Sequence, residues 1–168
     1  MKRYALIVMM SLGGLVGMNA QSVTKYQALF VYNFTRFIEW PSNGSNEFVI
    51  GILGKSEIYS DLQSVTASKK VGAQTIVLKK FSNPSEVVSC QILFVSSEVS
   101  SQISQLATSM QSKNTLIISD RPGSTNKGAG INFVIDDGKQ RFEISKANVD
   151  KTGLKMNKQL VDMAMVTD

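Results

Sequence analysis

The sequence has no histidine and only one cysteine among its 168 residues. Histidine is the commonest general base and metal ligand in proteins, so its absence excludes reactions that depend on an imidazole. Without histidine, a single thiol also excludes the structural zinc sites that are built from four cysteine or histidine ligands. The lone cysteine, Cys90, has no partner for an internal disulfide, so packing alone must hold the fold together.

The short motifs of common enzyme classes are missing as well. Gly-x-Ser-x-Gly does not occur, and Ser56 follows Gly54 and Lys55 without the glycine spacing of a phosphate-binding loop. Cys90 precedes the apolar run at residues 92–95, which indicates a buried thiol rather than a reactive one. The sequence therefore predicts a protein that is not an enzyme, with no catalytic residue, no cofactor and no metal.

Charge of either sign is scarce. The chain carries 18 Lys and Arg against 13 Asp and Glu, a net charge of +5, and Lys2 and Arg3 supply two of the positive charges. Proteins that bind single-stranded nucleic acid combine basic residues with aromatic residues between them. The lysine pairs at 69–70 and 79–80 have no such aromatic residues among them. We therefore expect no nucleic-acid partner.

The N-terminal segment has the pattern of a secretion signal. Lys2 and Arg3 precede a largely apolar run at residues 4–18, and small and polar residues follow up to Ala20. This pattern predicts a signal peptide over residues 1–20, cleavage after Ala20, and one domain over residues 21–168. The apolar run is short for a membrane span, and no later segment is longer, so we expect no direct membrane insertion after cleavage.

Residues 23–38 have the periodicity of a helix. Tyr26, Phe30, Phe34 and Phe37 recur at intervals of four, four and three and form one stripe. Further apolar residues lie on other faces, so this helix is either deeply buried or partly covered by another chain. Pro41 is expected to end it.

Strands and helices then alternate along the chain. Such an alternation, with short strands that are apolar throughout, is typical of a parallel sheet covered on both faces. Asp136-Asp137-Gly138-Lys139 separates two strand-like runs and favours an antiparallel hairpin, and a helical tail follows. We predict an α/β three-layer sandwich with a largely parallel sheet of about six strands, a C-terminal β-hairpin and closing helices. The strands are expected at 47–53, 74–79, 91–95, 115–118, 131–135 and 140–144. The helices are expected at 56–67, 96–110 and 147–166, the last one with a break near Gly153.

The loop after residues 115–118 is a candidate binding site. Ligands of open α/β sheets bind outside the carboxyl ends of strands, and this loop holds polar groups and glycines. Asp120, Gly128, Gly130 and Asn132 are the candidates there. The alternative is a surface loop whose glycines only satisfy turn geometry.

The hairpin supplies two further candidates. Arg141 and Glu143 are two residues apart and share one face of the strand, whereas Phe142 and Ile144 share the other face and are expected in the core. Arg141 and Glu143 would provide the donor and acceptor for a ligand or partner. Otherwise they are a solvated pair of little energetic weight.

Several segments resemble the YfiR/HmsC-like family of exported regulatory proteins. The first covers residues 29–41, an aromatic helix that ends in Trp40-Pro41. Others follow in the order of the family over nearly all of the chain after residue 20, at 50–54, 90–95, 116–120, 130–134, 141–144 and 153–164. The residues that carry the structural signature are Phe34, Trp40, Pro41, Cys90 and Phe142.

The resemblance implies a periplasmic domain that represses a membrane-bound diguanylate cyclase by binding the periplasmic sensor domain of the cyclase. Release of that repression raises cyclic di-GMP and favours biofilm formation. The resemblance also implies a homodimer, and disulfides that this chain cannot form internally with Cys90 alone. The resemblance does not say whether the receptor is a diguanylate cyclase, a sensor kinase or another membrane protein. The competing hypothesis is a cell-envelope small-molecule-binding protein with a pocket at the glycine loop and Arg141/Glu143.

Overall fold

The computed structural model describes residues 20–167, which build an eight-stranded sheet in the order β10-β8-β7-β6-β5-β2-β4-β3. Five central strands are parallel to one another. They are β2 (Glu47–Leu53), β4 (Gln74–Phe81), β5 (Ile92–Val95), β6 (Leu116–Ser119) and β7 (Ile131–Asp136). The predicted α/β fold with a largely parallel sheet is thus confirmed.

The predicted strand number, about six, was too low. β3 (Lys70–Val71) pairs antiparallel with β4 at one edge, and β10 (Met165–Val166) pairs parallel with β8 (Lys139–Ile144) at the other. A second, two-stranded sheet joins β1 (Ile38–Glu39) to β9 (Lys155–Met156). Each missed strand is two residues long, which is too short for an alternation of apolar and polar residues to show.

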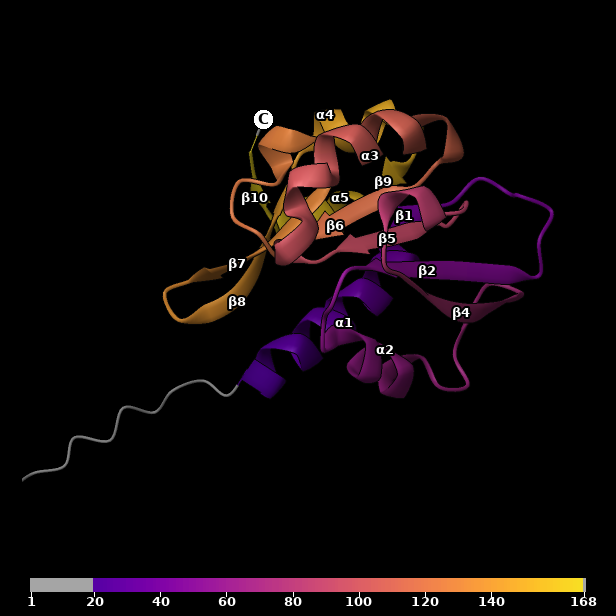
Figure 1. Ribbon diagram of the computed structural model, residues 1–168, viewed down its shortest axis with the longest axis horizontal. Helices are drawn as coiled ribbons and strands as arrows, with labels where there is room; N and C mark the ends of the chain where they lie inside the picture. The colour runs from indigo at the N-terminus through magenta and orange to yellow at the C-terminus, as the bar shows by residue number, and fades with distance from the viewer. Residues whose placement is uncertain (1–19, 168) are drawn as a thin grey trace, which may run out of the picture.

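Helices cover both faces of the main sheet (Figure 1). α1 (Ala20–Phe37), α2 (Ile58–Thr66) and α5 (Lys158–Asp162) supply buried side chains to one face. The 3₁₀ segment η2 (Ser97–Gln102) continues into α3 (Ile103–Met110), which covers the other face. α4 (Lys146–Lys151) follows β8, and the remaining 3₁₀ turns are η1 (Pro84–Glu86), η3 (Gln111–Lys113) and η4 (Thr125–Lys127).

Two apolar layers result from this arrangement. The layer on the α1 side includes Phe34, Phe48, Phe94, Phe133 and Phe142, all buried. The layer on the α3 side is mostly made of smaller side chains, among them Val49, Leu53, Cys90, Leu93 and Leu106, and it also includes Phe81. Because successive residues of a strand point to opposite faces, neighbours such as Phe48 and Val49 contribute to different layers.

Aromatic rings fix α1 to the hairpin. Phe30 and Phe34 of α1 lie 5.2 Å from Phe142 of β8, measured between ring centroids, and about as near to Phe133 of β7, at 6.2 and 6.1 Å. Ring pairs at such distances add to the free energy of burial. The helix predicted over residues 23–38 is therefore a core helix along this stripe.

The helix ends earlier than predicted. α1 stops at Phe37, because Ile38 and Glu39 pair with Met156 and Lys155 of β9. Trp40 follows: its indole N–H donates to the Thr35 carbonyl at 3.1 Å, and its ring meets that of Phe48 edge-on at 5.1 Å. Trp40 thus closes the end of the α1-side layer, while Pro41 is exposed.

Nearly all of the predicted signal peptide, residues 1–19, lies outside the described residues, and its cleavage after Ala20 stays a prediction. Between residues 20 and 167, no helix combines the length and apolar character that crossing a membrane requires.

Candidate functional site

Asp120 lies at the carboxyl end of β6, beside the start of η2. One of its carboxylate oxygens, Oδ1, is buried and has no hydrogen-bond partner among residues 20–167. Burial raises the pKa of this carboxyl above its ordinary value, and the backbone N–H groups of Asp120 and Ser97 partly oppose that rise. The Oγ of Ser96, next to Ser97, is likewise buried without a partner in the described chain.

Asn132 and Glu143 form a pair across the hairpin. The two residues are opposite each other in the register of β7 and β8, and the Asn132 amide donates to the Glu143 carboxylate at 3.1 Å. Asn132 is wholly buried, and its Oδ1 has no partner in the described part of the chain. Glu143 therefore satisfies a buried donor and is only partly exposed.

Arg141 lies nearer the tip of the same hairpin. Its Nε is 3.2 Å from a carboxylate oxygen of Asp136, and both side chains are about half exposed. As predicted, Arg141 and Glu143 share one face of β8, whereas Phe142 and Ile144 are buried on the other. The two candidates thus have different partners instead of forming a pair with each other.

Gly128 and Gly130 line a cavity of about 480 Å³ between α3, α4 and the loop before β7, which we call the α3–α4 cavity. The Gly130 N–H donates to the Ile117 carbonyl in the middle of β6. The structure therefore distributes the predicted site residues over three places: the end of β6, the hairpin and this cavity. Asn132 and Glu143 are brought together, as are Gly128 and Gly130, but the six do not converge on one pocket.

The sequence analysis missed a groove between α1 and α5, which we call the α1–α5 groove. Its volume is also about 480 Å³, and its lining combines the aromatic stripe of α1 with Phe142 of β8 and residues of α5. They are Phe30, Asn33, Phe34, Arg36, Phe37, Phe142, Asn157, Gln159, Leu160 and Met163. The stripe at residues 26–37 was the available signal, but the opposite wall comes from a segment more than 120 residues later.

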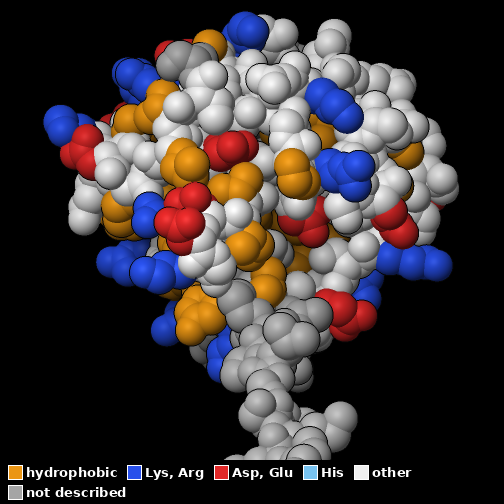
Figure 2. Space-filling view, turned by 90° about the vertical axis from the view of Figure 1, so that its left-hand side faces the viewer, with side chains coloured by type: hydrophobic (Ala, Val, Ile, Leu, Met, Phe, Trp, Pro, Cys, Tyr) orange, Lys and Arg blue, Asp and Glu red, His pale blue; other side chains and the backbone are white. Residues whose placement is uncertain are grey.

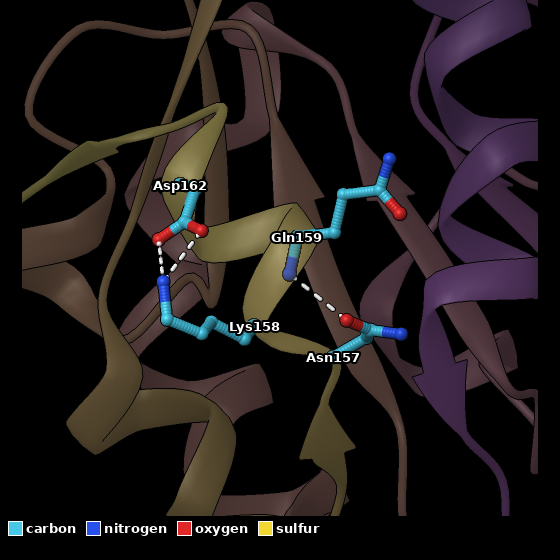
Figure 3. A network of polar contacts seen from close by, with 4 residues as sticks. All are labelled: Asn157, Lys158, Gln159 and Asp162. Carbon is cyan, nitrogen blue, oxygen red and sulfur yellow. Dashed lines mark hydrogen bonds and ion pairs between the residues drawn. The ribbon is translucent and has the colours of Figure 1, made fainter.

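The α5 wall is a short, locally stabilised helix (Figure 3). The Asn157 side chain accepts a hydrogen bond from the Gln159 N–H at 2.9 Å and so caps the first turn. Lys158 pairs with Asp162 one turn later at 2.7 Å. In Figure 3 the Gln159 side chain extends toward α1, so a polar group lies at the edge of the groove.

The segments that line this groove also carry most of the exposed apolar side chains. Seven large apolar residues are exposed among those described, and six of them belong to α1, the β7–β8 hairpin and the C-terminal segment. We call these six the apolar surface: Tyr26, Leu29, Ile135, Met163, Met165 and Val166. Figure 2 shows hydrophobic side chains concentrated on the face that contains the hairpin and the start of α1. The seventh, Val88, lies elsewhere, between η1 and β5.

Helix geometry connects the apolar surface to the groove. Tyr26 and Leu29 lie four residues before Phe30 and Asn33, so they extend the groove-lining stripe toward the start of α1. The Gln27 amide donates to Gln140 of β8 at 3.3 Å, which places the tip of the hairpin beside the start of α1. Neighbouring exposed apolar residues of this kind are typical of an interaction surface.

Comparison with known proteins identifies a family and a fold. A family model described as YfiR/HmsC-like matches residues 24–165. Two solved structures match 86% of the chain, and the chain spans 60% of each of them. One is a conserved domain protein from Vibrio cholerae (TM-score 0.60, 11% identity), and the other is an ABC domain from Streptococcus pneumoniae in complex with L-Trp (TM-score 0.57, 14% identity). At such identities they show the α/β fold alone. No curated protein sequence matches the chain significantly.

Proposed function

The chain belongs to the YfiR/HmsC-like family, a family of periplasmic regulatory proteins, and on that premise we propose that it modulates a membrane signalling receptor by binding the receptor's periplasmic sensor domain. The docking surface is the apolar surface together with the α1–α5 groove. The occupant is an apolar segment of the sensor domain of a diguanylate cyclase or, as the second candidate, of a sensor kinase.

One observation carries this proposal: six of the seven exposed large apolar residues in the described chain lie on three segments that meet around one groove. Protein interfaces have an apolar centre and a polar rim, and here Asn33, Arg36, Asn157 and Gln159 line the same groove as Phe30 and Phe37. A surface of this composition fits a protein partner better than a small polar ligand.

Binding alone does not regulate a receptor. A ligand shifts a two-state receptor only by the difference between its affinities for the two states. We therefore expect the docked protein to prefer the inactive state of the receptor. Loss of binding should then raise receptor output instead of lowering it.

The test compares two substitutions at residues of equal exposure. Met163 in the groove and Val88 outside it are each 49% exposed, so Met163→Asp and Val88→Asp introduce the same charge at similar cost in solvation. Each variant is expressed in a strain that lacks the gene, and cyclic di-GMP is measured beside the protein level in the periplasmic fraction. We expect Met163→Asp to leave cyclic di-GMP as high as in the strain without the gene and Val88→Asp to restore the wild-type level.

Direct binding is measured with the purified sensor domain of the candidate receptor by calorimetry. An affinity that Met163→Asp and Leu29→Asp leave unchanged would place the docking surface elsewhere on the molecule. A receptor that binds at the apolar surface while cyclic di-GMP stays constant would favour the sensor kinase over the cyclase.

The homodimer and the small-molecule alternative stay predictions. For the alternative, Arg141 and Glu143 are already engaged by Asp136 and Asn132, so a ligand at these groups has to displace an existing contact. Gly128 and Gly130, by contrast, line a separate cavity, and none of the six residues of the apolar surface lines it.

A further inference from the structure

The α3–α4 cavity lies apart from the receptor-docking surface proposed above. None of the six residues of the apolar surface and none of the α1–α5 groove residues lines it. Its volume of about 480 Å³ falls within the range of roughly 300–1,000 Å³ in which proteins bind small molecules.

The glycines of the loop determine the shape of this cavity. A Cβ on Gly128, which has φ of +108°, would lie 2.6 Å from the Cβ of Ala107 on α3. A Cβ on Gly130 would lie 2.8 Å from a methyl carbon of Val149 on α4. Glycine at these positions therefore lets the loop backbone pass directly against both helices and form the floor of the cavity.

Hydrogen bonds from α4 hold the loop in place. The side-chain amide of Asn148 donates to the carbonyls of Thr125 and Ala129, at 2.7 and 3.0 Å. The Asn114 amide similarly donates to the Thr152 carbonyl at the end of α4, at 2.7 Å. The wall is thus built before any ligand arrives, which lowers the entropy cost of binding.

The charged groups that line the cavity are both positive, and no described residue that lines it carries a carboxylate. Lys127 and Lys151 supply two ammonium groups, and Gln111 and Asn126 supply two amides. None of these four side chains has a hydrogen bond or ion pair within residues 20–167, whereas the hydroxyls of Thr115 and Thr152 already donate to backbone carbonyls.

For one of the two lysines, stabilisation of a helix already accounts for its position, but for the other it does not. Lys151 lies in the last turn of α4, where a positive charge complements the helix dipole. Lys127 is the last residue of the three-residue 3₁₀ turn η4, which has no comparable dipole. Lys127 is exposed and lines the cavity, so it is the side chain that points most directly to a bound anion.

We propose that the α3–α4 cavity binds a small organic anion. Lys127 and Lys151 neutralise its phosphate or carboxylate group, Gln111 and Asn126 donate hydrogen bonds to its other oxygens, and the apolar side chain of Ala107 contacts its body. This binding does not depend on a receptor.

The test titrates the uniformly ¹⁵N-labelled protein with two probes at constant ionic strength, citrate as the carboxylate and glucose 6-phosphate as the phosphate ester, with glucose as the uncharged reference. We expect the amide resonances of Gly128, Gly130 and Thr152 to shift with at least one anion and not with glucose. Which anion binds identifies the source of the negative group.

Matched lysine variants distinguish specific binding of the anion in the cavity from non-specific attraction of the anion to the positively charged protein. Lys127→Gln should weaken binding about fivefold, the effect of losing roughly one partly exposed ion pair. Lys139→Gln removes the same charge at the exposed hairpin tip, outside the cavity, and should leave the affinity unchanged. Absence of shifts at Gly128 and Gly130 with both anions up to 10 mM or so, or equal weakening by the two variants, would overturn the proposal.

Discussion

At the scale of single residues, burial decides which reactive groups can act. Cys90 is 2% exposed and belongs to the α3-side layer. Burial raises the pKa of its thiol to about 12, while the Gly51 backbone and the charges of Lys113 and Lys79 have smaller, opposing effects. Since the thiolate is the nucleophile, a thiol of this kind is chemically inert at neutral pH.

Alkylation measures this inertness. At pH 8 we expect iodoacetamide to label native Cys90 about a thousandfold more slowly than the urea-unfolded chain, because the pKa rise lowers the thiolate fraction by about that factor. The control is the doubly substituted Val88→Cys, Cys90→Ala protein, whose new thiol replaces a 49% exposed side chain and should react quickly in the native state. Equal rates for the two native proteins would contradict a buried Cys90.

At the scale of elements, the β7–β8 hairpin separates two side chains that the sequence analysis treated alike. Arg141 has an exposed ion pair with Asp136, whereas Glu143 accepts a hydrogen bond from an asparagine that is wholly buried. An exposed pair contributes little to stability, but a buried donor that loses its acceptor retains its full cost of desolvation.

Urea denaturation distinguishes the two. Arg141→Ala should lower the free energy of unfolding by no more than about 0.5 kcal/mol, because its ion pair is solvated. Glu143→Ala should lower it by about 1–3 kcal/mol, because the amide of Asn132 is left without a partner. Glu143→Gln, which keeps an acceptor oxygen, is the matched control and should retain most of that stability. Equal losses for the two alanine variants would show that the buried hydrogen bond carries no weight.

The same hairpin shows what the sequence could predict about elements. Its turn could be predicted because the sequence Asp-Gly favours the two-residue hairpin turn, which requires positive φ at both residues. Asp137 and Gly138 indeed have φ of 47° and 71°. The strand at residues 47–53 was likewise predicted with the bounds that the structure has. Both rest on local signals: turn residues in one case, a continuous apolar run in the other.

Elements that depend on distant partners could not be predicted. The tail at residues 147–166 was expected to be helical with a break near Gly153; the structure has that break, but it divides the tail further into α4, β9, α5 and β10. β9 forms only because Lys155 and Met156 meet Glu39 and Ile38, and β10 only because β8 offers a free edge. The α1–α5 groove escaped the sequence analysis for the same reason, since neither wall alone indicates the other.

At the scale of the whole molecule, the sheet separates two apolar layers that no disulfide joins. The α1-side layer holds most of the buried aromatic residues, whereas the α3-side layer is mainly aliphatic and includes Phe81. They share the same strands, since neighbouring residues such as Leu93 and Phe94 are both fully buried but on opposite faces. If disruption of the packing in one layer destabilises the shared strands, the other layer unfolds with it, and the domain unfolds as a single cooperative unit.

The lone tryptophan makes this coupling measurable. Trp40 packs against Phe48 in the α1-side layer, so its fluorescence reports on that layer, whereas far-UV circular dichroism reports on the entire sheet and all helices. Leu106→Ala creates a cavity in the opposite layer, where Leu106 is 2% exposed, and should cost about 2–5 kcal/mol. In one cooperative unit, both probes must shift to the same lower urea midpoint. Gln105→Ala, an exposed neighbour on α3, should move neither probe. A fluorescence midpoint that stays at the wild-type value while the dichroism midpoint falls would mean that the two layers unfold separately, and the docking groove on α1 would then keep its shape when α3 is lost.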